Sequence, residues 1–302
     1  MKIGLWAGSS PASTALFKKG LAHFRRLGWT AVVPAATRKG ACRKESTLRP
    51  FLAGTDQDKV KAFLQLWQDS RLRDIFGVRG GYGTLRLLPH LEKVKLQSSR
   101  PKRIWGFSDF TVIQNYLYDR CGASWVHSPF STSRAFFETT RSEDKYWKKI
   151  LSGKEAQLDH NLECLNGPKS LRIKAPMIGG NLASFVTLLG TRWEPRPKKK
   201  YILFLEDIAE PPYKVDRMLT QLAGSQLFNR CAAVVLGHFT ECERAEKICA
   251  EWAKEHQVPL FAGLKAGHDR PNLPIWMGVD AILTHKNRQE CRLLVPNPKL
   301  EC

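Results

Sequence analysis

Ser108 and Asp109 stand between an apolar run and a segment with helical spacing, in the stretch IWGFSDFT at 104–111. A serine on a sharp turn from strand to helix presents its hydroxyl at the edge of a sheet, where the next backbone N–H can stabilise an oxyanion. The same two residues can equally cap the helix that follows, because serine and aspartate are preferred at that position. The stretch therefore predicts either a nucleophile or a helix cap.

A nucleophilic serine needs a general base and a group that orients this base. Glu206 follows five apolar residues, which is an unusual place for a carboxylate outside a polar site. His268 lies in a loop after the apolar stretch PLFAG. Each also has a plain structural interpretation, a charge at the end of a strand for Glu206 and an exposed loop residue for His268. On these residues alone both interpretations stay open.

The loop RGGYG at 79–83 offers a further element of such a site. Glycines permit backbone conformations closed to other residues, so this loop can bring N–H donors close to an anion or a developing oxyanion. A plain tight turn explains the same residues equally well. The loop follows an apolar run, as Ser108, Glu206 and His268 do, and ligands gather at the carboxyl ends of strands in open parallel sheets. These segments are therefore the candidate functional positions.

Alternating apolar runs and amphipathic segments predict the strands and helices that must hold these residues. In the first half we expect strands at 2–7, 29–35, 74–78, 103–107 and 124–129, with helices at 14–28, 55–70, 84–94 and 109–120. In the second half we expect strands at 201–207, 232–239 and 258–264, a glycine turn feeding a helix at 179–191, and helices at 213–225 and 243–256. This alternation is typical of α/β proteins with parallel sheets.

The composition shifts to charged and polar residues between about 138 and 173, which suits a connection between domains. We expect an N-terminal doubly wound parallel-sheet domain at 1–150, a linker at 151–173 and a C-terminal α/β domain at 174–302. A chain of 302 residues has the length for two domains of ordinary size. The first domain would carry the serine turn, and the second the glutamate and the histidine.

The chain is strongly basic. With 48 Lys and Arg against 28 Asp and Glu, its formal net charge is +20, which favours association with anions. The basic residues are scattered and form no stripe interleaved with aromatic residues, so a solvated basic surface is expected and a specific nucleic-acid partner is not. A non-catalytic protein that binds anions or nucleic acid remains the alternative from another class.

Several classes of protein lack support in this sequence. No apolar stretch approaches the roughly eighteen residues of a membrane span, and the N-terminal apolar run is too short for a signal peptide, so a cytoplasmic protein without membrane insertion is expected. The eight cysteines are spaced singly without a C-x-x-C unit, which indicates reduced thiols. No histidine spacing suits a metal, so neither a metal nor another cofactor is expected.

Five elements, in order along about two hundred residues, resemble the LD-carboxypeptidase family of serine peptidases, which includes the microcin C self-immunity peptidases. RGGYGTLRLLPHL resembles its R-G-G-Y-G element and GFSDFT its nucleophile turn. IGGNLASFVTLLGT resembles its G-G-N-L element, LFLEDIAEPPYKVDRMLTQL its L-E-D block, and GLKAGHDRPNLPIWMGVDA its G-H block. Five ordered elements are far more specific than any one alone.

The resemblance implies a triad of Ser108 as nucleophile, His268 as general base and then acid, and Glu206 as the group that orients the imidazole. The family's oxyanion hole consists of backbone N–H groups, which correspond here to Asp109 and a glycine of the RGGYG loop, Gly81. Its implied substrate is a cytoplasmic muropeptide, from which the terminal D-alanine is cut at an L,D bond during peptidoglycan recycling. Relatives of this family also imply a homodimer.

Substrate contacts are less specific in the sequence. A guanidinium suits the terminal carboxylate that a carboxypeptidase must hold, and three arginines lie in or near the motif loops. Residues of the RGGYG loop are further candidates; the full set of weak substrate-binding candidates is Arg79, Gly80, Tyr82, Arg86 and Arg270.

The chain departs from the family pattern in places. Asp269 stands where glycine usually follows the histidine, Trp276 lies in a stretch usually made of Leu and Pro, and HSP at 127–129 replaces a frequent H-G-P. These changes affect the expected substrate more than the chemistry. The nearest alternative therefore keeps the triad and changes the substrate to an aminoacyl-nucleotide conjugate, as in the microcin-type immunity peptidases, although the full RGGYG loop favours a muropeptide.

Overall fold

The computed structural model describes residues 1–41, 49–96, 101–154, 157–286 and 290–298. The chain divides into an N-terminal unit, Met1–Lys154, and a C-terminal unit, Glu155–Pro298. Among the described residues, no helix combines the length and the apolarity that a bilayer crossing requires. Cys42 and Cys302 lie outside the described residues, and the other six cysteines are free thiols.

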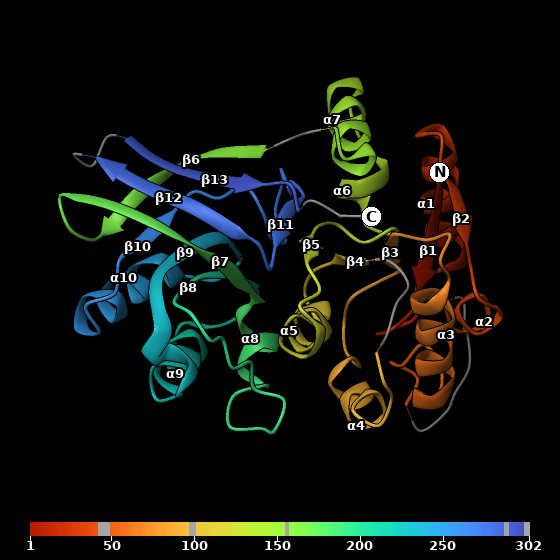
Figure 1. The fold of residues 1–302 in the computed structure, drawn as a ribbon, viewed down its shortest axis with the longest axis horizontal. Coiled ribbons are helices and arrows are strands. Elements are labelled where there is room, and N and C mark those ends of the chain that lie inside the picture. The colour runs from red at the N-terminus through yellow and green to blue at the C-terminus, as the bar shows by residue number, and fades with distance from the viewer. Residues whose placement is uncertain (42–48, 97–100, 155–156, 287–289, 299–302) are drawn as a thin grey trace. The chain divides into compact units, whose positions relative to one another are not determined.

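A parallel sheet forms the centre of the N-terminal unit (Figure 1). Within this unit its strands run in the order β5-β4-β3-β1-β2, and every neighbouring pair is parallel. The strands are short, and all but the edge strand β2 are almost entirely buried, as expected for a sheet covered on both faces. Their bounds are Lys2–Trp6 (β1), Thr30–Val32 (β2), Asp74–Gly77 (β3), Arg103–Gly106 (β4) and Trp125–His127 (β5).

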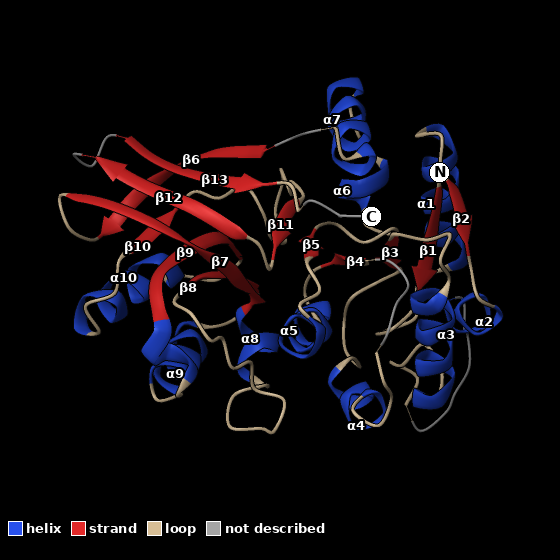
Figure 2. Ribbon diagram, in the orientation of Figure 1, coloured by secondary structure: helices blue, strands red, loops and turns tan. Residues whose placement is uncertain are grey.

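Helices cover both faces of this sheet (Figure 2). Trp6 aligns with Gly77 in the register of β1 and β3, so Trp6 and Phe76 lie on opposite faces. Phe76 contacts Phe24 of α1 at 5.0 Å between ring centroids, and Trp6 contacts Phe63 of α3 at 4.9 Å. The doubly wound prediction is therefore confirmed. The helices are Thr14–Arg26 (α1), Ala35–Ala41 (α2), Asp56–Gln68 (α3), Leu88–Leu91 (α4), Phe110–Cys121 (α5), Arg134–Phe137 (α6) and Arg141–Ser152 (α7), with a short 3₁₀ turn at Leu85–Leu87.

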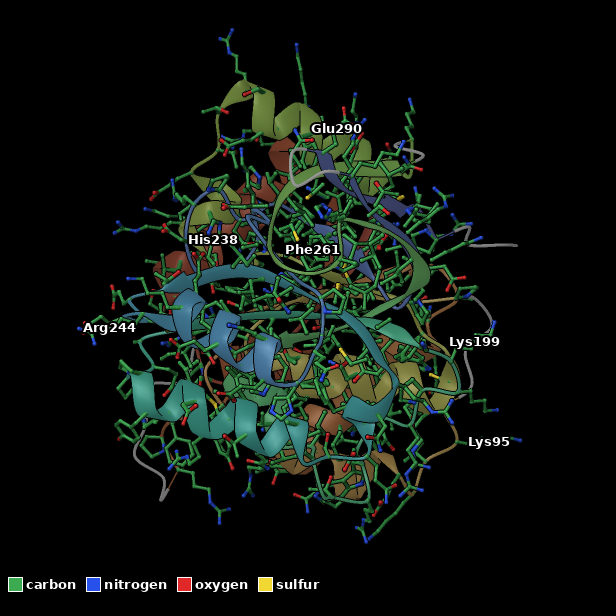
Figure 3. All side chains as sticks on the ribbon, turned by 90° about the vertical axis from the view of Figure 1, so that its left-hand side faces the viewer. Lys95, Lys199, His238, Arg244, Phe261 and Glu290 are labelled. Carbon is green, nitrogen blue, oxygen red and sulfur yellow. The ribbon has the colours of Figure 1, made fainter. Side chains whose placement is uncertain are left out.

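A closed barrel forms the C-terminal unit, in the strand order β10-β6-β13-β12-β7-β8-β9. The strands β7 to β10 pair in parallel along one arc, and antiparallel pairs complete the barrel. Figure 3 shows the side chains of this unit, including Phe261 of β10, which is fully buried. The bounds are Gln157–Asn166 (β6), Ser170–Asn181 (β7), Tyr201–Ile208 (β8), Cys231–Thr240 (β9), Leu260–Ala262 (β10), Ile275–Met277 (β11), Asp280–Lys286 (β12) and Glu290–Pro296 (β13).

The helices of the C-terminal unit follow the strands that carry the motif residues. The predicted helices at 213–225 and 243–256 are present with slightly different ends, and the helix predicted after the glycine turn is a single short one. They are Leu182–Val186 (α8), Pro212–Ala223 (α9) and Ala245–Glu255 (α10), with a 3₁₀ turn at Leu227–Arg230.

The sequence did not predict the long antiparallel strands of the barrel. β6 lies within the segment 151–173 that the composition suggested as a linker, and β12 and β13 follow the last predicted strand. These strands alternate buried with exposed side chains, and the exposed ones are often charged, so their composition resembles that of a connection. The division at 1–150, 151–173 and 174–302 stays a prediction.

The aromatic packing around Phe76 should dominate the stability of the N-terminal unit. Phe76→Ala should lower the free energy of unfolding by about 3–5 kcal/mol, since it removes a fully buried ring that contacts Phe24 and Trp105. Denaturant unfolding of the full chain measures this change. Lys61→Ala, on an exposed position of α3, should change it by less than about 0.5 kcal/mol. Equal unfolding midpoints for the two variants would contradict the packing argument.

Candidate active site

Ser108 lies in the sharp turn between β4 and α5. Its φ is 54°, in the left-handed region that costs a residue with a side chain about 1–3 kcal/mol. The Thr111 N–H donates to the Ser108 carbonyl at 2.9 Å, which ties the turn to the first turn of α5. A strained turn of this kind holds the serine side chain at the carboxyl end of the strand.

The structure tests the helix-cap interpretation of this stretch. No side chain caps the N-terminus of α5, although Asp109 occupies the capping position. The Asp109 carboxylate instead accepts hydrogen bonds from the backbone N–H groups of Gly83 and Thr84, at 3.1 and 3.0 Å. The helix-cap interpretation is therefore wrong for both Ser108 and Asp109.

The RGGYG loop packs directly against the serine turn. A Cβ on Gly80 would lie 3.2 Å from the Ser108 Cβ, which is tighter than ordinary contact. Gly81 has a φ of 99°, and a Cβ there would lie 2.4 Å from the Ser10 Oγ, so only glycine fits. The Tyr82 N–H donates to this same Ser10 Oγ at 3.2 Å. The glycines thus bring loop backbone next to Ser108.

Two backbone donors beside Ser108 are available to a ligand. Within the described part of the chain, neither the Gly81 N–H nor the Asp109 N–H donates a hydrogen bond to protein. Such preorganised N–H groups can stabilise negative charge on a substrate oxygen. The serine turn and the RGGYG loop thus together offer a hydroxyl and two candidate oxyanion donors.

Glu206 lies near the end of β8 and is completely buried. A carboxylate removed from water needs a charged or hydrogen-bonding partner, because desolvation without one costs several kcal/mol. His268 supplies this partner, with its Nδ1 at 2.7 Å from the Glu206 Oε2. The interpretation of Glu206 as a charge turned to water is therefore wrong.

Gly267 allows the loop after β10 to reach Glu206. A Cβ on Gly267 would lie 3.0 Å from the Glu206 Oε2 and 3.1 Å from the Cβ of His238, which Figure 3 labels. The φ of Gly267 is 131°, a conformation that other residues rarely adopt. Only 15% of the His268 side chain is exposed, so His268 is not a solvated loop histidine.

The contact with Glu206 sets the protonation of His268. An ionised carboxylate only accepts hydrogen bonds, so the imidazole Nδ1 carries a proton and Nε2 carries the lone pair of the neutral ring. Burial lowers the pKa of His268, but the charge and hydrogen bond of Glu206, with a further contribution from Asp207, outweigh it and raise the pKa above 6.5. This pair can accept and return a proton near neutral pH.

The other carboxylates near Glu206 have different partners. Asp207 accepts from the Asn181 side chain, at 2.8 Å, and from the Ala183 N–H, also at 2.8 Å. Burial raises the pKa of Asp207 to about 6. Glu210 forms an ion pair with Lys214 at 3.5 Å. Among the acids of this strand end, Glu206 is thus the one that bonds to His268.

The sequence matches profiles of known domains over both units. A profile described as the LD-carboxypeptidase N-terminal domain matches residues 3–128, and one described as the LD-carboxypeptidase C-terminal domain matches residues 174–283. The chain belongs to the LD-carboxypeptidase family. As a member of this family the protein is a hydrolase of the serine-peptidase type, and the resemblance of the five ordered motifs is confirmed.

Individual relatives agree with this family. A murein tetrapeptide carboxypeptidase of Pseudomonas aeruginosa is 31% identical to this chain, and the match covers 77% of this chain and 79% of the relative. The microcin C7 self-immunity protein of Escherichia coli is 23% identical over 95% of the chain and 91% of its own. The crystal structure of a muramoyltetrapeptide carboxypeptidase from Oxalobacter formigenes has the same fold, with a TM-score of 0.82, 24% identity and coverage of 98% and 99% of the two chains.

The three candidate arginines of the LD-carboxypeptidase differ in their surroundings. Arg86 makes a bidentate contact with Asp56, at 2.5 and 3.3 Å, and this hydrogen bonding raises the pKa of the guanidinium. Arg79 is exposed and donates to the Pro11 carbonyl at 2.6 Å. Arg270 is exposed in the loop that carries His268. Which of them binds a substrate carboxylate stays a prediction.

Sequence reasoning missed Ser9 and Ser10, which follow β1 and are buried. Ser9 Oγ bonds to the Asp109 carboxylate, and the Ser10 N–H donates to the Gly80 carbonyl at 3.2 Å. A signal was present in the sequence, because the stretch GSS at 8–10 stands at the carboxyl end of a parallel strand, as the predicted residues do.

Among the described residues, no group of three His, Cys, Asp or Glu side chains has the arrangement of a metal site.

The raised pKa of His268 can be measured directly. NMR titration of its imidazole should give a pKa above 6.5, and Glu206→Gln should lower this value, because burial still opposes the charged ring while the largest favourable contribution is gone. Glu243→Gln, which removes an exposed carboxylate, should leave it unchanged. A wild-type pKa below 6.5, or equal values in both variants, would contradict this account of the pair.

Proposed function

We propose that this LD-carboxypeptidase removes the terminal D-alanine from muropeptide tetrapeptides, using Ser108, His268 and Glu206 as a catalytic triad. The observation that carries the proposal is the buried pair of Glu206 and His268, joined at 2.7 Å through Nδ1. This pair is the base and the orienting group that a serine peptidase requires. The murein carboxypeptidase at 31% identity supports the substrate class.

The proposed reaction begins with attack by Ser108 on the carbonyl of the last peptide bond. The Ser108 oxygen bonds to the carbonyl carbon while its proton passes to Nε2 of His268, and Glu206 stabilises the resulting imidazolium. The tetrahedral oxyanion collapses, the C–N bond breaks, and His268 gives the proton to the departing amine. Water then attacks the acyl-enzyme with His268 again as base, which releases the shortened peptide and regenerates Ser108.

The backbone N–H groups of Gly81 and Asp109 would hold the oxyanion. Their support is the contact of the RGGYG loop with Ser108 and the two unused donors described above. Gly80 and Tyr82, in the same loop, are the proposed substrate contacts. Tyr82 is 45% exposed and therefore accessible to a ligand.

The wider role follows from the same proposal. Muropeptides carry several carboxylates, so the net charge of +20 would favour their encounter with the enzyme. We place the reaction in peptidoglycan recycling, with a cytoplasmic enzyme that acts as a homodimer and needs no cofactor.

A second substrate class has a specific observation in its favour. The similarity to the microcin C7 self-immunity protein extends over 95% of the chain, and a solved structure of that relative in complex with glutamyl sulfamoyl guanosine has a TM-score of 0.78 to this one. Its identity of 23% is lower than the 31% of the murein carboxypeptidase, so the muropeptide is the first proposal.

Mass spectrometry distinguishes the two substrates and tests the nucleophile. The wild-type enzyme should remove one alanine from a muropeptide tetrapeptide and leave an aminoacyl-sulfamoyl adenosine intact. Ser108→Ala should abolish the cleavage, with a loss of at least about 10³-fold, while the chain stays folded by circular dichroism. Full activity of this variant would refute the triad, and cleavage of only the sulfamoyl conjugate would refute the substrate.

The dependence of the rate on pH tests the base. His268 must be neutral to accept a proton, so kcat/KM should rise with pH through a midpoint above 6.5, in accordance with its raised pKa. Glu206→Gln should lower kcat by orders of magnitude and move the midpoint to lower pH. An unchanged rate and midpoint in Glu206→Gln would remove Glu206 from the mechanism.

A further inference from the structure

We propose that the Asp109 carboxylate is a positioning residue that holds the RGGYG loop in place beside the Ser108 turn. The inference deepens the proposed function, since it rests on the assignment of Gly81 and Asp109 as oxyanion donors. The nucleophile turn would thus carry its own device for fixing the second half of the oxyanion hole.

The contacts of Asp109 join three segments that are distant in the sequence. Its carboxylate accepts from the N–H groups of Gly83 and Thr84 and bonds to Ser9 Oγ, and its carbonyl accepts from the Thr84 hydroxyl at 2.6 Å. Ser9 is 100 positions away, and the loop residues about 25. Asp109 is 4% exposed, so water does not compete for these bonds.

Only a carboxylate satisfies this set of donors. The two backbone N–H groups reach different oxygens, Gly83 to Oδ1 and Thr84 to Oδ2. Asparagine has a single oxygen, so its NH₂ group would face one of these N–H donors and leave it unsatisfied. Burial raises the pKa of Asp109, while the hydrogen bonds that it accepts from Ser9, Thr84 and Gly83 act to lower it.

A buried cation, Lys59, lies close to Gly83 of the loop. Lys59 of α3 is 2% exposed, and a Cβ on Gly83 would lie 3.1 Å from its Nζ. Burial lowers the pKa of Lys59, against the opposing effects of Asp56 and, more weakly, of the Asp109 charge. Lys59 also pairs with Asp56 at 3.3 Å, and Arg86 pairs with the same carboxylate. Asp109 therefore holds Gly83 and Thr84 through their backbone N–H groups, and Lys59 lies close to Gly83.

This arrangement links the two proposed oxyanion donors through one residue. Asp109 supplies one donor from its backbone, and its side chain holds Gly83, two residues after the other donor, Gly81. Oxyanion stabilisation depends on donors preorganised to within a few tenths of an ångström, because they must match the charge that develops in the transition state. We call the bonds of the Asp109 carboxylate to Ser9, Gly83 and Thr84 the clasp. Loss of the clasp should therefore weaken stabilisation of the transition state more than substrate binding.

Asp109→Asn in the full chain tests the inference, with Asp58→Asn as a matched control on an exposed position of the same unit. Amide hydrogen exchange of Gly83 and Thr84, followed by NMR without substrate, should become at least about tenfold faster in Asp109→Asn and stay unchanged in Asp58→Asn. Unchanged exchange would overturn the inference. This readout does not depend on any peptidase activity.

Kinetics with a muropeptide tetrapeptide supply the second readout. Asp109→Asn should lower kcat by about 10- to 100-fold with KM within about twofold, as expected when transition-state stabilisation is lost; kcat is expressed per folded enzyme, because a smaller folded fraction alone would give the same split. A rise in KM at constant kcat would contradict the positioning role. If Asp109→Asn fails to fold, Ser9→Ala replaces it in the test, because it removes one bond to the carboxylate without changing the carboxylate itself. Ser9→Ala should lower kcat by a smaller factor, again with KM nearly unchanged.

Ser108→Ala in the same assay separates the two levels of the argument. An inactive Ser108→Ala with a fully active Asp109→Asn would overturn the clasp and leave the triad intact. An active Ser108→Ala would overturn the proposed function, whereas the exchange of Gly83 and Thr84 would still decide whether Asp109 holds the loop.

Discussion

The complete burial of the Glu206 carboxylate is the constraint on which the candidate active site depends. A charge removed from water must be matched by a partner with good geometry, and here the partner is the imidazole of His268 at 2.7 Å. Glu206 follows five buried residues of β8, Tyr201 to Leu205, and this strand is fixed in the barrel, so the carboxylate cannot move to water. The loop of His268 has to come to it, and Gly267 makes that approach possible because it has no Cβ to block it.

Both units use a buried aspartate to hold the backbone near a functional residue. Asp109 follows Ser108 and accepts from the backbone of Gly83 and Thr84, while Asp207 follows Glu206 and accepts from the Ala183 N–H at the start of α8. In each case the residue next to the chemical group binds a neighbouring segment. At each strand end, one of two adjacent polar residues is the candidate catalytic group, and the side chain of the other accepts hydrogen bonds from the backbone of a neighbouring segment.

Much of the candidate site could be predicted from the sequence, because its residues follow apolar runs in a parallel α/β pattern. The carboxyl ends of such strands gather at one edge, so Ser108 and the RGGYG loop were expected to lie together, and they do. The same rule applied to Ser9 would have added it to the site. The barrel strands β6, β12 and β13 were missed because one face of each is polar, and a polar alternation in an isolated segment resembles a loop.

Residue type and local spacing were enough to predict the chemical groups, their order along the chain, the family, and the alternation of strands and helices. Which carboxylate meets His268 becomes clear only in the folded chain, because Glu206, Asp207 and Glu210 stand within five positions and differ in direction, burial and partners. The folded chain also shows that the Asp109 side chain bonds to Ser9, Gly83 and Thr84 and does not cap α5. Partners separated by 62 and 100 positions, as His268 is from Glu206 and Ser9 from Asp109, are chosen by packing in three dimensions and not by local preference.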